Sequence, residues 1–485
     1  MPTTVSVGTS QPITTLDPRV ASVGADVDAA ALMYETLALA DSALDTRPQL
    51  AASWTLRADR RTIDVRLRPD GRFHAGQAVR ASDVIRSFEP SATDTVGRDR
   101  LRSVIHLLDG GDAFLAGRAQ RIAGLSIVDS LTVALRFAPG VAPTMAIFTE
   151  LPTAIRGPGA SATIVNGTGP WRLARRTRGD SALVLARVRP APGRPDSMYY
   201  GTIEAERLSA LLSTGQIDCM PWVSLAGRRQ LAARTDVTLQ DGGQWEAQVL
   251  DVTPRRAAWH DHRARRGLAH AIDRSSYLRV LGLRSAMVTS GLLSPTGAFG
   301  DEVSPALPYD PTAARALLDS AGIRAGDTIR IFVRSGRGSD TTLGLPSLLA
   351  ASLRAIDLVP VFRVHDRLDA ALGSGAVDVA NYAITLRNIT DEAVMELFSD
   401  RSLGTGGVPI PALPRLERAY HAGPTADQRR AALRALNALV AREQPVIPLW
   451  FAAPTAAGRV TVAGCRADGI ALHRFLDLRH VEPAR

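Results

Sequence analysis

The sequence predicts an α/β protein with two or three lobes, and three observations support this prediction. Strand-like and helical periods alternate along the chain, which is typical of an α/β architecture. The chain has 485 residues, whereas a single hydrophobic core usually stops growing at about 250–300 residues. Gly and Pro punctuate the connections without forming a long linker. Lobes without a linker usually share chain crossovers, so a hinged arrangement is expected.

In the first part of the chain, two strands and two helices are expected. Residues 5–9 and 63–67 alternate between apolar and small or polar residues, as strands do. Residues 26–40 carry apolar side chains at helical spacing and predict a helix. A second helix is predicted over residues 82–88, with Asp83 in its cap.

The rest of the chain continues the alternation. Strand-like patterns return at residues 173–188 and 203–208. Asp310 is placed to cap a helix, and Gln444-Pro445 closes another long predicted helix. The helices expected in this part are residues 209–213, 263–281, 311–321 and 426–443.

The positive charge of the chain comes from arginine alone. The formal net charge is +9, and the 57 basic residues are all arginine because the chain has no lysine. The arginines are scattered and do not form the basic stripe that a nucleic-acid groove needs. Without lysine, the chain cannot form a Schiff base or complete a Walker-A phosphate loop. We therefore expect no nucleic-acid partner and exclude these two classes of enzyme.

Signals for cross-linking and targeting are sparse. Cys219 and Cys465 allow at most one disulfide, and Cys219 follows a strand-like stretch, where we expect a buried thiol. No apolar run of about 18 residues predicts a membrane span. The first ten residues hold neither a signal peptide nor a lipid-attachment cysteine. If a targeting segment was removed, the protein is an extracytoplasmic, membrane-anchored lipoprotein; if Met1 is the native start, it is cytoplasmic.

A collinear series of short motifs extends over nearly the whole chain. The motifs are residues 16–18 (LDP), 34–37 (YETL), 48–54, 67–76, 81–87, 167–171 (GTGPW), 211–218, 261–274 (DHRARRGLAHAIDR), 309–322, 445–449 and 462–464. Each motif alone is weak, but their common order is specific. In this order the chain resembles the extracytoplasmic solute-binding proteins of family 5, the oligopeptide-, dipeptide- and nickel-binding components of ABC importers.

The resemblance implies a class C periplasmic-binding-protein-like fold, an α/β fold with two hinged lobes and an extra inserted domain. The implied parts are residues 1–36, 168–244 and 445–485 for the first lobe, 37–167 for the inserted subdomain of that lobe, and 245–444 for the second lobe. The two chain crossovers near Trp245 and Pro445 would form the hinge.

The same resemblance indicates which segments line the ligand cleft: the loop after the first strand, the hinge, and a loop of the second lobe. A solute site needs backbone groups, aromatic surfaces and a few well-placed polar side chains. For the two tryptophans near the hinge, packing in a core is the alternative interpretation. The candidate ligand-binding residues are Thr9, Ser10, Gln11, Thr14, Trp222, Trp245, Asn381, Tyr382, Arg387 and Asn388.

One candidate departs from the family pattern. Peptide binders of this family often place an Asp in a "gW..D..DP" loop, where it pairs with the ammonium group of the peptide. In the corresponding residues 381–391 no Asp stands at this place, and Arg387 lies close to it. A guanidinium suits a carboxylate or a phosphate, so the ligand is expected to be anionic there. The alternative is that Arg387 is a solvated loop residue, since arginine is abundant in this chain.

No group of residues predicts catalysis or a metal site. The chain has no GxSxG elbow and no HExxH motif. Residues 260–262 (HDH) lack a third ligand, and Asp261 is interpreted as the start of a helix. His74 is interpreted as a hydrogen-bonded structural histidine, and Asp26 and Asp28 as solvated positions on a helix.

The sequence therefore predicts a solute-binding protein rather than an enzyme. We expect a monomer that binds a small molecule or short peptide, needs no cofactor or metal, and delivers its ligand to an ABC permease. The alternative is a binding-protein fold that was recruited as a cytoplasmic biosynthetic enzyme or a ligand sensor.

Overall fold

The structure is a computed structural model, and the chain in it forms two compact units. The described residues are 3–21, 24–41, 45–90, 94, 97, 100–161, 163–177, 182–242, 246–283, 285–295, 304–334, 344–365, 375–385, 395, 408, 410–467 and 477–481. Unit 1 comprises Met1–Gly242, His421–Ala426 and Thr455–Arg485, and unit 2 comprises Gly243–Tyr420 and Asp427–Pro454. Each unit has its own sheets and is described by itself.

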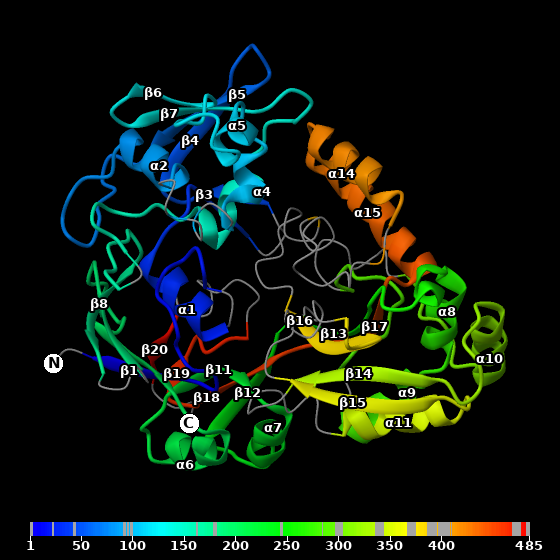
Figure 1. The fold of residues 1–485 in the computed structure, drawn as a ribbon. Coiled ribbons are helices and arrows are strands. Elements are labelled where there is room, and N and C mark those ends of the chain that lie inside the picture. Colours follow the sequence, from blue (N-terminus) through cyan, green and yellow to red (C-terminus); the bar gives the residue numbers. More distant parts are fainter. Residues whose placement is uncertain are drawn as a thin grey trace. The chain divides into compact units, whose positions relative to one another are not determined.

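Unit 1 is built on a seven-stranded sheet of order β12-β18-β11-β1-β10-β9-β8 (Figure 1). Its strands are β1 (Thr4–Thr9), β8 (Trp171–Arg176), β9 (Ala182–Arg187), β10 (Ser197–Thr202), β11 (Cys219–Val223), β12 (Val237–Asp241) and β18 (Thr455–Arg459). β1 runs parallel to both β10 and β11, and the remaining neighbours are antiparallel. The predicted strand at residues 5–9 is confirmed. The strand predicted at 203–208 is wrong, because the strand ends at Thr202 and a turn of 3-10 helix follows.

Helices and a short ribbon complete this part of unit 1. They are α1 (Gly24–Met33), the 3-10 helix Ala205–Arg207, α6 (Leu208–Ser213), α7 (Leu225–Leu231), β19 (Val462–Ala463) and β20 (Arg479–His480). Val5 and Val7 of β1 and Ala29 and Met33 of α1 are fully buried in one apolar core. The parallel centre of the sheet is therefore held against α1.

The helix predicted over residues 26–40 is shorter than expected. α1 ends at Met33, whose carbonyl accepts a hydrogen bond of 3.0 Å from the Gly169 amide. A Cβ at Gly169 would lie 2.5 Å from the carbonyl oxygen of Leu32, so only glycine allows this close approach. A loop more than 130 residues away in the sequence thus closes the helix, and a short strand follows it.

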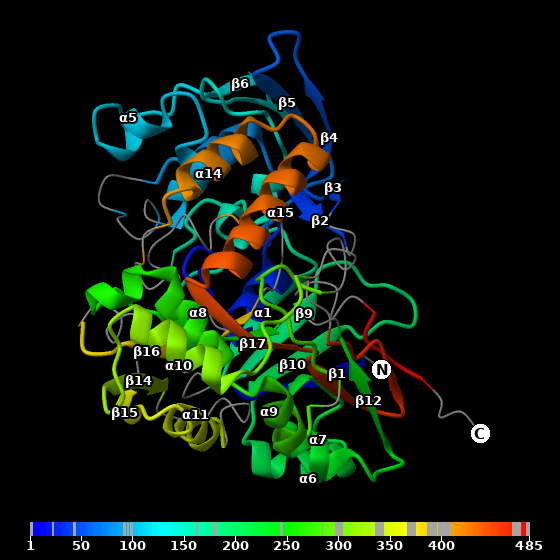
Figure 2. The same cartoon turned by 90° about the vertical axis from the view of Figure 1, so that its right-hand side faces the viewer.

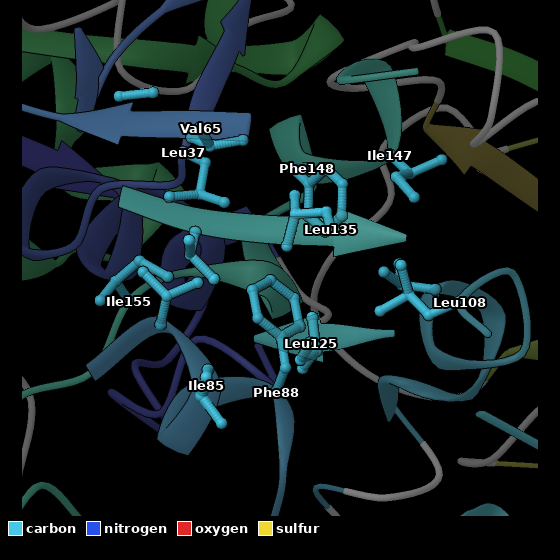
Figure 3. Packing of buried hydrophobic residues seen from close by; sticks show 14 of the residues in the cluster. Leu37, Val65, Ile85, Phe88, Leu108, Leu125, Leu135, Ile147, Phe148 and Ile155 are labelled. Carbon is cyan, nitrogen blue, oxygen red and sulfur yellow. The ribbon is translucent and has the colours of Figure 1, made fainter. Parts of the chain in front are cut away.

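A subdomain of unit 1 has its own antiparallel sheet of order β4-β5-β7-β6. Its elements are β2 (Ala38–Ala40), β3 (Thr46–Pro48), β4 (Ala51–Leu56), β5 (Thr62–Leu67), α2 (Ala81–Phe88), α4 (Arg102–Ile105), α5 (Gly111–Leu115), β6 (Leu125–Asp129), β7 (Thr132–Arg136) and the 3-10 helices Ala146–Thr149 and Leu151–Thr153. Figure 3 shows Phe88 and Leu135 among the side chains of its core, where the rings of Phe88 and Phe148 meet edge to face at 5.4 Å. This separate core explains how residues 37–155 fold as an insertion in unit 1.

Unit 2 is built on a five-stranded sheet of order β15-β14-β16-β13-β17. Its strands are β13 (Glu246–Val252), β14 (Thr328–Arg334), β15 (Val359–His365), β16 (Val379–Thr385) and β17 (Val446–Ala452). β14 runs parallel to β15 and β16, whereas β13 is antiparallel to β16 and β17. The strand after Pro445 was expected in the first lobe, but it pairs with β13 and belongs to unit 2.

The helices of unit 2 include the two predicted at residues 311–321 and 426–443, and the prediction at residues 263–281 is the exception. They are the 3-10 helix Ala257–His260, α8 (His262–His270), α9 (Arg274–Leu281), α10 (Pro311–Ser320), α11 (Leu345–Arg354), α14 (Leu413–Ala422), which ends in the short segment of unit 1, and α15 (Ala426–Glu443). Figure 2 shows α8 and α10 side by side, and Asp310 caps α10 with a bond of 2.8 Å from the Ala313 amide. The predictions for α10 and α15 are confirmed.

The exception is the single helix predicted over residues 263–281. It is two helices, because Asp273 accepts a hydrogen bond from the Ser276 amide and caps α9. Arg274 is buried and donates to the carbonyls of Pro448 and Ala269 at 2.9 and 3.0 Å. The bond to the Pro448 carbonyl, 174 residues away, helps to fix the break between the two helices, and no local sequence pattern indicates it.

Candidate functional site

The carboxyl end of β1 is a topological switch point in unit 1. β1 lies between two parallel neighbours, β10 and β11, and the chain leaves its carboxyl end at Thr9. In open α/β sheets, ligands bind outside the carboxyl ends of parallel strands at such a point. The loop that begins with Ser10 is therefore the part of unit 1 that is best placed to contact a ligand.

The start of this loop is tied to the neighbouring strand. The Thr202 hydroxyl donates to the Gln11 carbonyl at 3.1 Å, and the Ile203 amide donates to the Thr9 carbonyl at 2.8 Å. The Gln11 amide donates to the Thr9 hydroxyl at 3.3 Å. Ser10 is half-buried, and no hydrogen bond of Ser10 is found within the described part of the chain. As far as the described residues show, its polar groups are available to bind a solute or water.

Asp26, in the first turn of α1, holds the second half of the loop. Its carboxylate accepts hydrogen bonds from the Thr14 amide at 2.7 Å, the Thr14 hydroxyl at 2.5 Å and the Thr15 amide at 3.2 Å. Asp26 is only 1% exposed, whereas Thr14 is exposed. Because the Thr14 hydroxyl donates its proton to Asp26, the Thr14 oxygen can serve a ligand only as an acceptor.

The prediction that Asp26 and Asp28 are solvated is wrong. Asp28 is also buried, and its carboxylate accepts a hydrogen bond of 3.4 Å from the Tyr200 hydroxyl. The partners of Asp26 are Thr14 and Thr15 in the loop after β1, whereas the partner of Asp28 is Tyr200 on β10. An Asp in the first turn of a helix that follows a loop is a sequence signal for this role, but the helical period alone did not reveal it.

Trp222 lies on a β-bulge of β11. Met220 pairs with Ala457 and Val223 pairs with Thr455, so two residues of β11 face one residue of β18. A bulge bends the strand and turns a side chain away from the regular alternation. The Trp222 side chain is half-buried at this position, which fits a partly open aromatic surface better than a closed core.

In unit 2 the equivalent switch point belongs to β14, which has parallel neighbours on both sides. Two of the predicted residues lie on β16, next to β14. Asn381 is buried, and its amide group accepts from Gln248 at 3.1 Å and donates to the Val249 carbonyl at 3.2 Å. The structure thus gives Asn381 a role in joining β16 to β13.

Tyr382 is the more exposed of the two. Its hydroxyl donates to the carboxylate of Asp251 at 2.9 Å, and Asp251 is fully buried on β13. Burial and the neighbouring negative charge of Asp251 raise the pKa of Tyr382 well above its ordinary value. Tyr382 therefore keeps its hydroxyl proton, which it donates to the buried acid Asp251.

A comparison with known proteins identifies the family of this chain. The family model of the bacterial extracellular solute-binding proteins, family 5, matches residues 45–403. The chain belongs to this family. Its fold is also that of solved relatives, which cover almost the whole chain.

Three similar proteins illustrate the family 5 match. The glutathione-binding protein GsiB of Escherichia coli O6:K15:H31 is 23% identical over 333 residues, which cover 66% of this chain and only 62% of GsiB. The periplasmic binding protein DppA of Helicobacter pylori, in complex with the peptide STSA, has 18% identity and a TM-score of 0.80, covering 99% of this chain and 98% of DppA. AgaA of A. tumefaciens R10, in complex with agropinic acid, has 17% identity and a TM-score of 0.81, covering 99% of both chains.

Three of the candidate ligand-binding residues predicted from the sequence lie outside the described residues: Trp245, Arg387 and Asn388. The candidates that the structure brings together at the β1 switch point are Thr9, Ser10 and Gln11, with Thr14 at the far end of the same loop. Thr202 was missed, because a strand was expected at residues 203–208, whereas β10 ends at Thr202.

The structural interpretations of the histidines are confirmed. Asp261 caps α8 with a bond of 2.8 Å from the Arg263 amide, so residues 260–262 form the start of a helix. His74 makes a hydrogen bond of 3.0 Å with the Gly169 carbonyl, and burial lowers its pKa. Among the residues that the structure describes, no three His, Cys, Asp or Glu side chains are grouped to hold a metal. No described helix is long and apolar enough to cross a membrane.

The two cysteines are not free thiols. Cys219 at the start of β11 forms a disulfide with Cys465, and their Cα atoms are 5.6 Å apart. The expectation of a buried thiol is therefore wrong, although Cys219 is buried. The bond joins the centre of the sheet of unit 1 to the segment after β19.

Proposed function

We propose that this chain is the solute-binding component of an ABC-type importer and that it closes on its ligand by a hinge. The match of residues 45–403 to the family 5 model carries this proposal. The topology supports it, because each unit has a switch point at a central parallel strand, β1 in unit 1 and β14 in unit 2. In this proposal units 1 and 2 are the two lobes, and residues 37–167 form the inserted subdomain.

The proposed ligand is a peptide-like or anionic small molecule. GsiB is named for glutathione, and the solved relatives hold a short peptide and agropinic acid. Glutathione is itself a peptide with two carboxylates, so it combines both properties. Arg387, near the place where family members often carry an anionic anchor, is proposed to pair with a ligand carboxylate.

The test is calorimetric titration with glutathione, the peptide STSA and agropinic acid. We expect at least one of them to bind with one site per chain. Arg387→Ala should then weaken binding of an anionic ligand by about 2–5 kcal/mol, the usual cost of losing one partner of a buried charge pair. Arg363→Ala, an exposed arginine of β15, is the control. No binding by any of the three would contradict the proposed ligand class, and equal affinities of both variants would remove Arg387 from the site.

Members of this family are extracellular, and we propose that this protein also works outside the cytoplasm. The disulfide between Cys219 and Cys465 supports this location, because such bonds persist in oxidising compartments. We further propose that the protein acts as a monomer, delivers its ligand to an ABC permease and is held at the membrane as a lipoprotein. Light scattering of the purified protein tests the monomer, and membrane fractionation of the native host tests the anchor.

A further inference from the structure

The chain first leaves unit 1 after β12 and returns to it for the last time at β18, and these two strands are neighbours in the sheet. β12 ends at Asp241, the boundary of the units falls between Gly242 and Gly243, and β18 begins at Thr455 directly after the later boundary. Asp241 and Thr455 are register partners and form the last pair of the β12–β18 ladder. In unit 2, the first residue of β13 pairs with the last residue of β17 in the same way. Each sheet thus ends in one strand pair at the crossovers.

The last pair in unit 1 is fixed by three side chains. The Thr455 hydroxyl donates to one carboxylate oxygen of Asp241 at 2.6 Å. Arg228 donates to the other carboxylate oxygen at 3.0 Å and to the Thr455 hydroxyl at 3.3 Å. We call Arg228, Asp241 and Thr455 the crossover clamp. Each of the three contacts the other two, so neither strand end separates without breaking hydrogen bonds.

The clamp is also tied to the body of unit 1. Arg228 lies on α7, whose first turn is capped by the Ser224 side chain directly after β11. β11 pairs with the other edge of β18, and the disulfide of Cys219 reinforces it. Thr455 is 3% exposed, whereas the Arg228 and Asp241 side chains are 39% and 34% exposed. Arg228 and Asp241 are therefore partly exposed, whereas Thr455 fixes the crossover clamp to the buried part of unit 1.

A cross-strand staple that served only local stability could lie anywhere along β12. This one occupies the single pair at which both crossover strands meet the unit boundary. The direction in which the two strands leave unit 1 sets the starting geometry of any hinge motion, because hinges absorb their rotation in a few residues at the ends of elements.

We infer that the crossover clamp is a positioning device that limits the range of inter-unit positions in the ligand-free protein. This inference rests on the proposed hinge function, but it concerns the free protein and needs no ligand. If the two units of the open state cover a narrower range of positions, less conformational entropy is lost when they close. The clamp therefore favours ligand binding without touching the ligand.

The test is single-molecule energy transfer between one dye on each unit. The two natural cysteines are joined in a disulfide, so Ser126→Cys on exposed β6 and Arg363→Cys on exposed β15 can be labelled selectively. We expect the distribution of transfer efficiencies in ligand-free protein to broaden in Asp241→Ala. Asp241→Asn should show an intermediate width, because an amide oxygen still accepts from Thr455 but carries no charge for Arg228.

The matched control is Asp236→Ala, which removes an aspartate paired with Arg234 at 2.9 Å at the other end of β12. Its distribution should equal that of the wild type. Equal widths for wild type and Asp241→Ala would overturn the inference and leave the clamp as a local staple. If Asp241→Ala does not fold, the same measurement is made on Arg228→Gln and Thr455→Val. A broader distribution in either supports the inference, and wild-type widths in both overturn it. If the proposed function is wrong, the protein binds no ligand in calorimetry. The transfer-efficiency distributions of the ligand-free wild type and variants do not depend on that result.

Discussion

At the scale of single residues, buried carboxylates organise the proposed ligand loop. Asp26 accepts three hydrogen bonds from Thr14 and Thr15 and is 1% exposed. Replacing it leaves two backbone amides and one hydroxyl without their partner, next to a buried side chain, although Thr14 itself is exposed and Thr15 is half-buried. An unsatisfied buried polar group costs about 1–3 kcal/mol. Asp26 therefore shapes the loop although its own side chain is buried.

We predict that Asp26→Ala lowers the free energy of unfolding of unit 1 by about 1–3 kcal/mol and also weakens glutathione or peptide binding. Asp59→Ala is the matched control, because Asp59 accepts the same set of bonds, from the Arg61 and Thr62 amides and the Thr62 hydroxyl, in the inserted subdomain. Denaturant titration and calorimetry measure the two effects. Unchanged affinity in Asp26→Ala would show that the loop does not take part in binding.

At the scale of elements, cross-links between distant segments hold unit 1 together. The disulfide joins β11 to the C-terminal segment across a sequence separation of 246 residues. A long closed loop removes much entropy from the unfolded chain, so such a bond stabilises the fold by about 2–5 kcal/mol. The last turn of α14 makes a second long-range contact, since the rings of His106 and His421 lie 6.0 Å apart.

We predict that the double variant Cys219→Ser, Cys465→Ser loses about 2–5 kcal/mol of stability in unit 1 only. Native-state hydrogen exchange of the seven-stranded sheet and of the five-stranded sheet measures each unit separately. Dithiothreitol should lower the melting temperature of the wild type and leave that of the variant unchanged. Equal sensitivity of both proteins to the reductant would contradict a stabilising disulfide.

The histidine contact predicts a dependence of stability on pH. Burial, together with the charge of His106, lowers the pKa of His421 from 6.5 to about 4. Below pH 6.5 the unfolded chain takes up the proton first, so the contribution of His421 is complete above this pH and is lost as the pH falls toward 4. The loss amounts to at most about 3 kcal/mol.

We therefore expect wild-type unit 1 to lose more stability than His421→Gln between pH 7.5 and 4.5, by about 2 kcal/mol. Urea titrations at the two pH values, followed by hydrogen exchange in unit 1, provide the measurement. His262→Gln, at the exposed start of α8, is the control and should behave like the wild type. Parallel pH profiles of wild type and His421→Gln would refute a lowered pKa.

At the scale of the whole molecule, the two units have separate sheets, and the chain passes between them next to strand ends and within the helices α14 and α15. The chain passes between the units after Gly242, Tyr420, Ala426 and Pro454. Two of these passages lie at the ends of paired strands, β12 with β18 in unit 1 and β13 with β17 in unit 2. This connectivity fits rotation of the units about a short hinge, as the proposed function requires.

We predict that a saturating ligand reduces the radius of gyration in X-ray scattering and raises the melting temperature. At a concentration of 100 times the dissociation constant, binding adds about 2.7 kcal/mol to the stability of the folded state. Mass spectrometry of the recovered ligand should show it chemically unchanged. A bound ligand with no change in the radius of gyration would argue against closure, and a converted ligand would favour the enzyme alternative.

The sequence by itself determined the family and the elements whose signals are local. The helix with Asp310 at its cap, the long helix that ends before Gln444, and the strand that ends at Thr9 lie where their patterns predict them. Helical period, capping and alternation depend on neighbours within about four residues, so they can be read along the chain. The order of short motifs then led to the family that the comparison shows.

The tertiary structure decided what depends on distant segments. Gly169 ends α1 at Met33, and Arg274 holds the break between α8 and α9 through a carbonyl 174 residues away. The burial of Asp26 and the pairing of Cys219 with Cys465 likewise follow from packing across the sheet. A polar residue looks solvated in a sequence until the element that covers it is known, because burial is a property of the assembled core. For this reason the loop at the β1 switch point was predictable, but the carboxylate that shapes it was not.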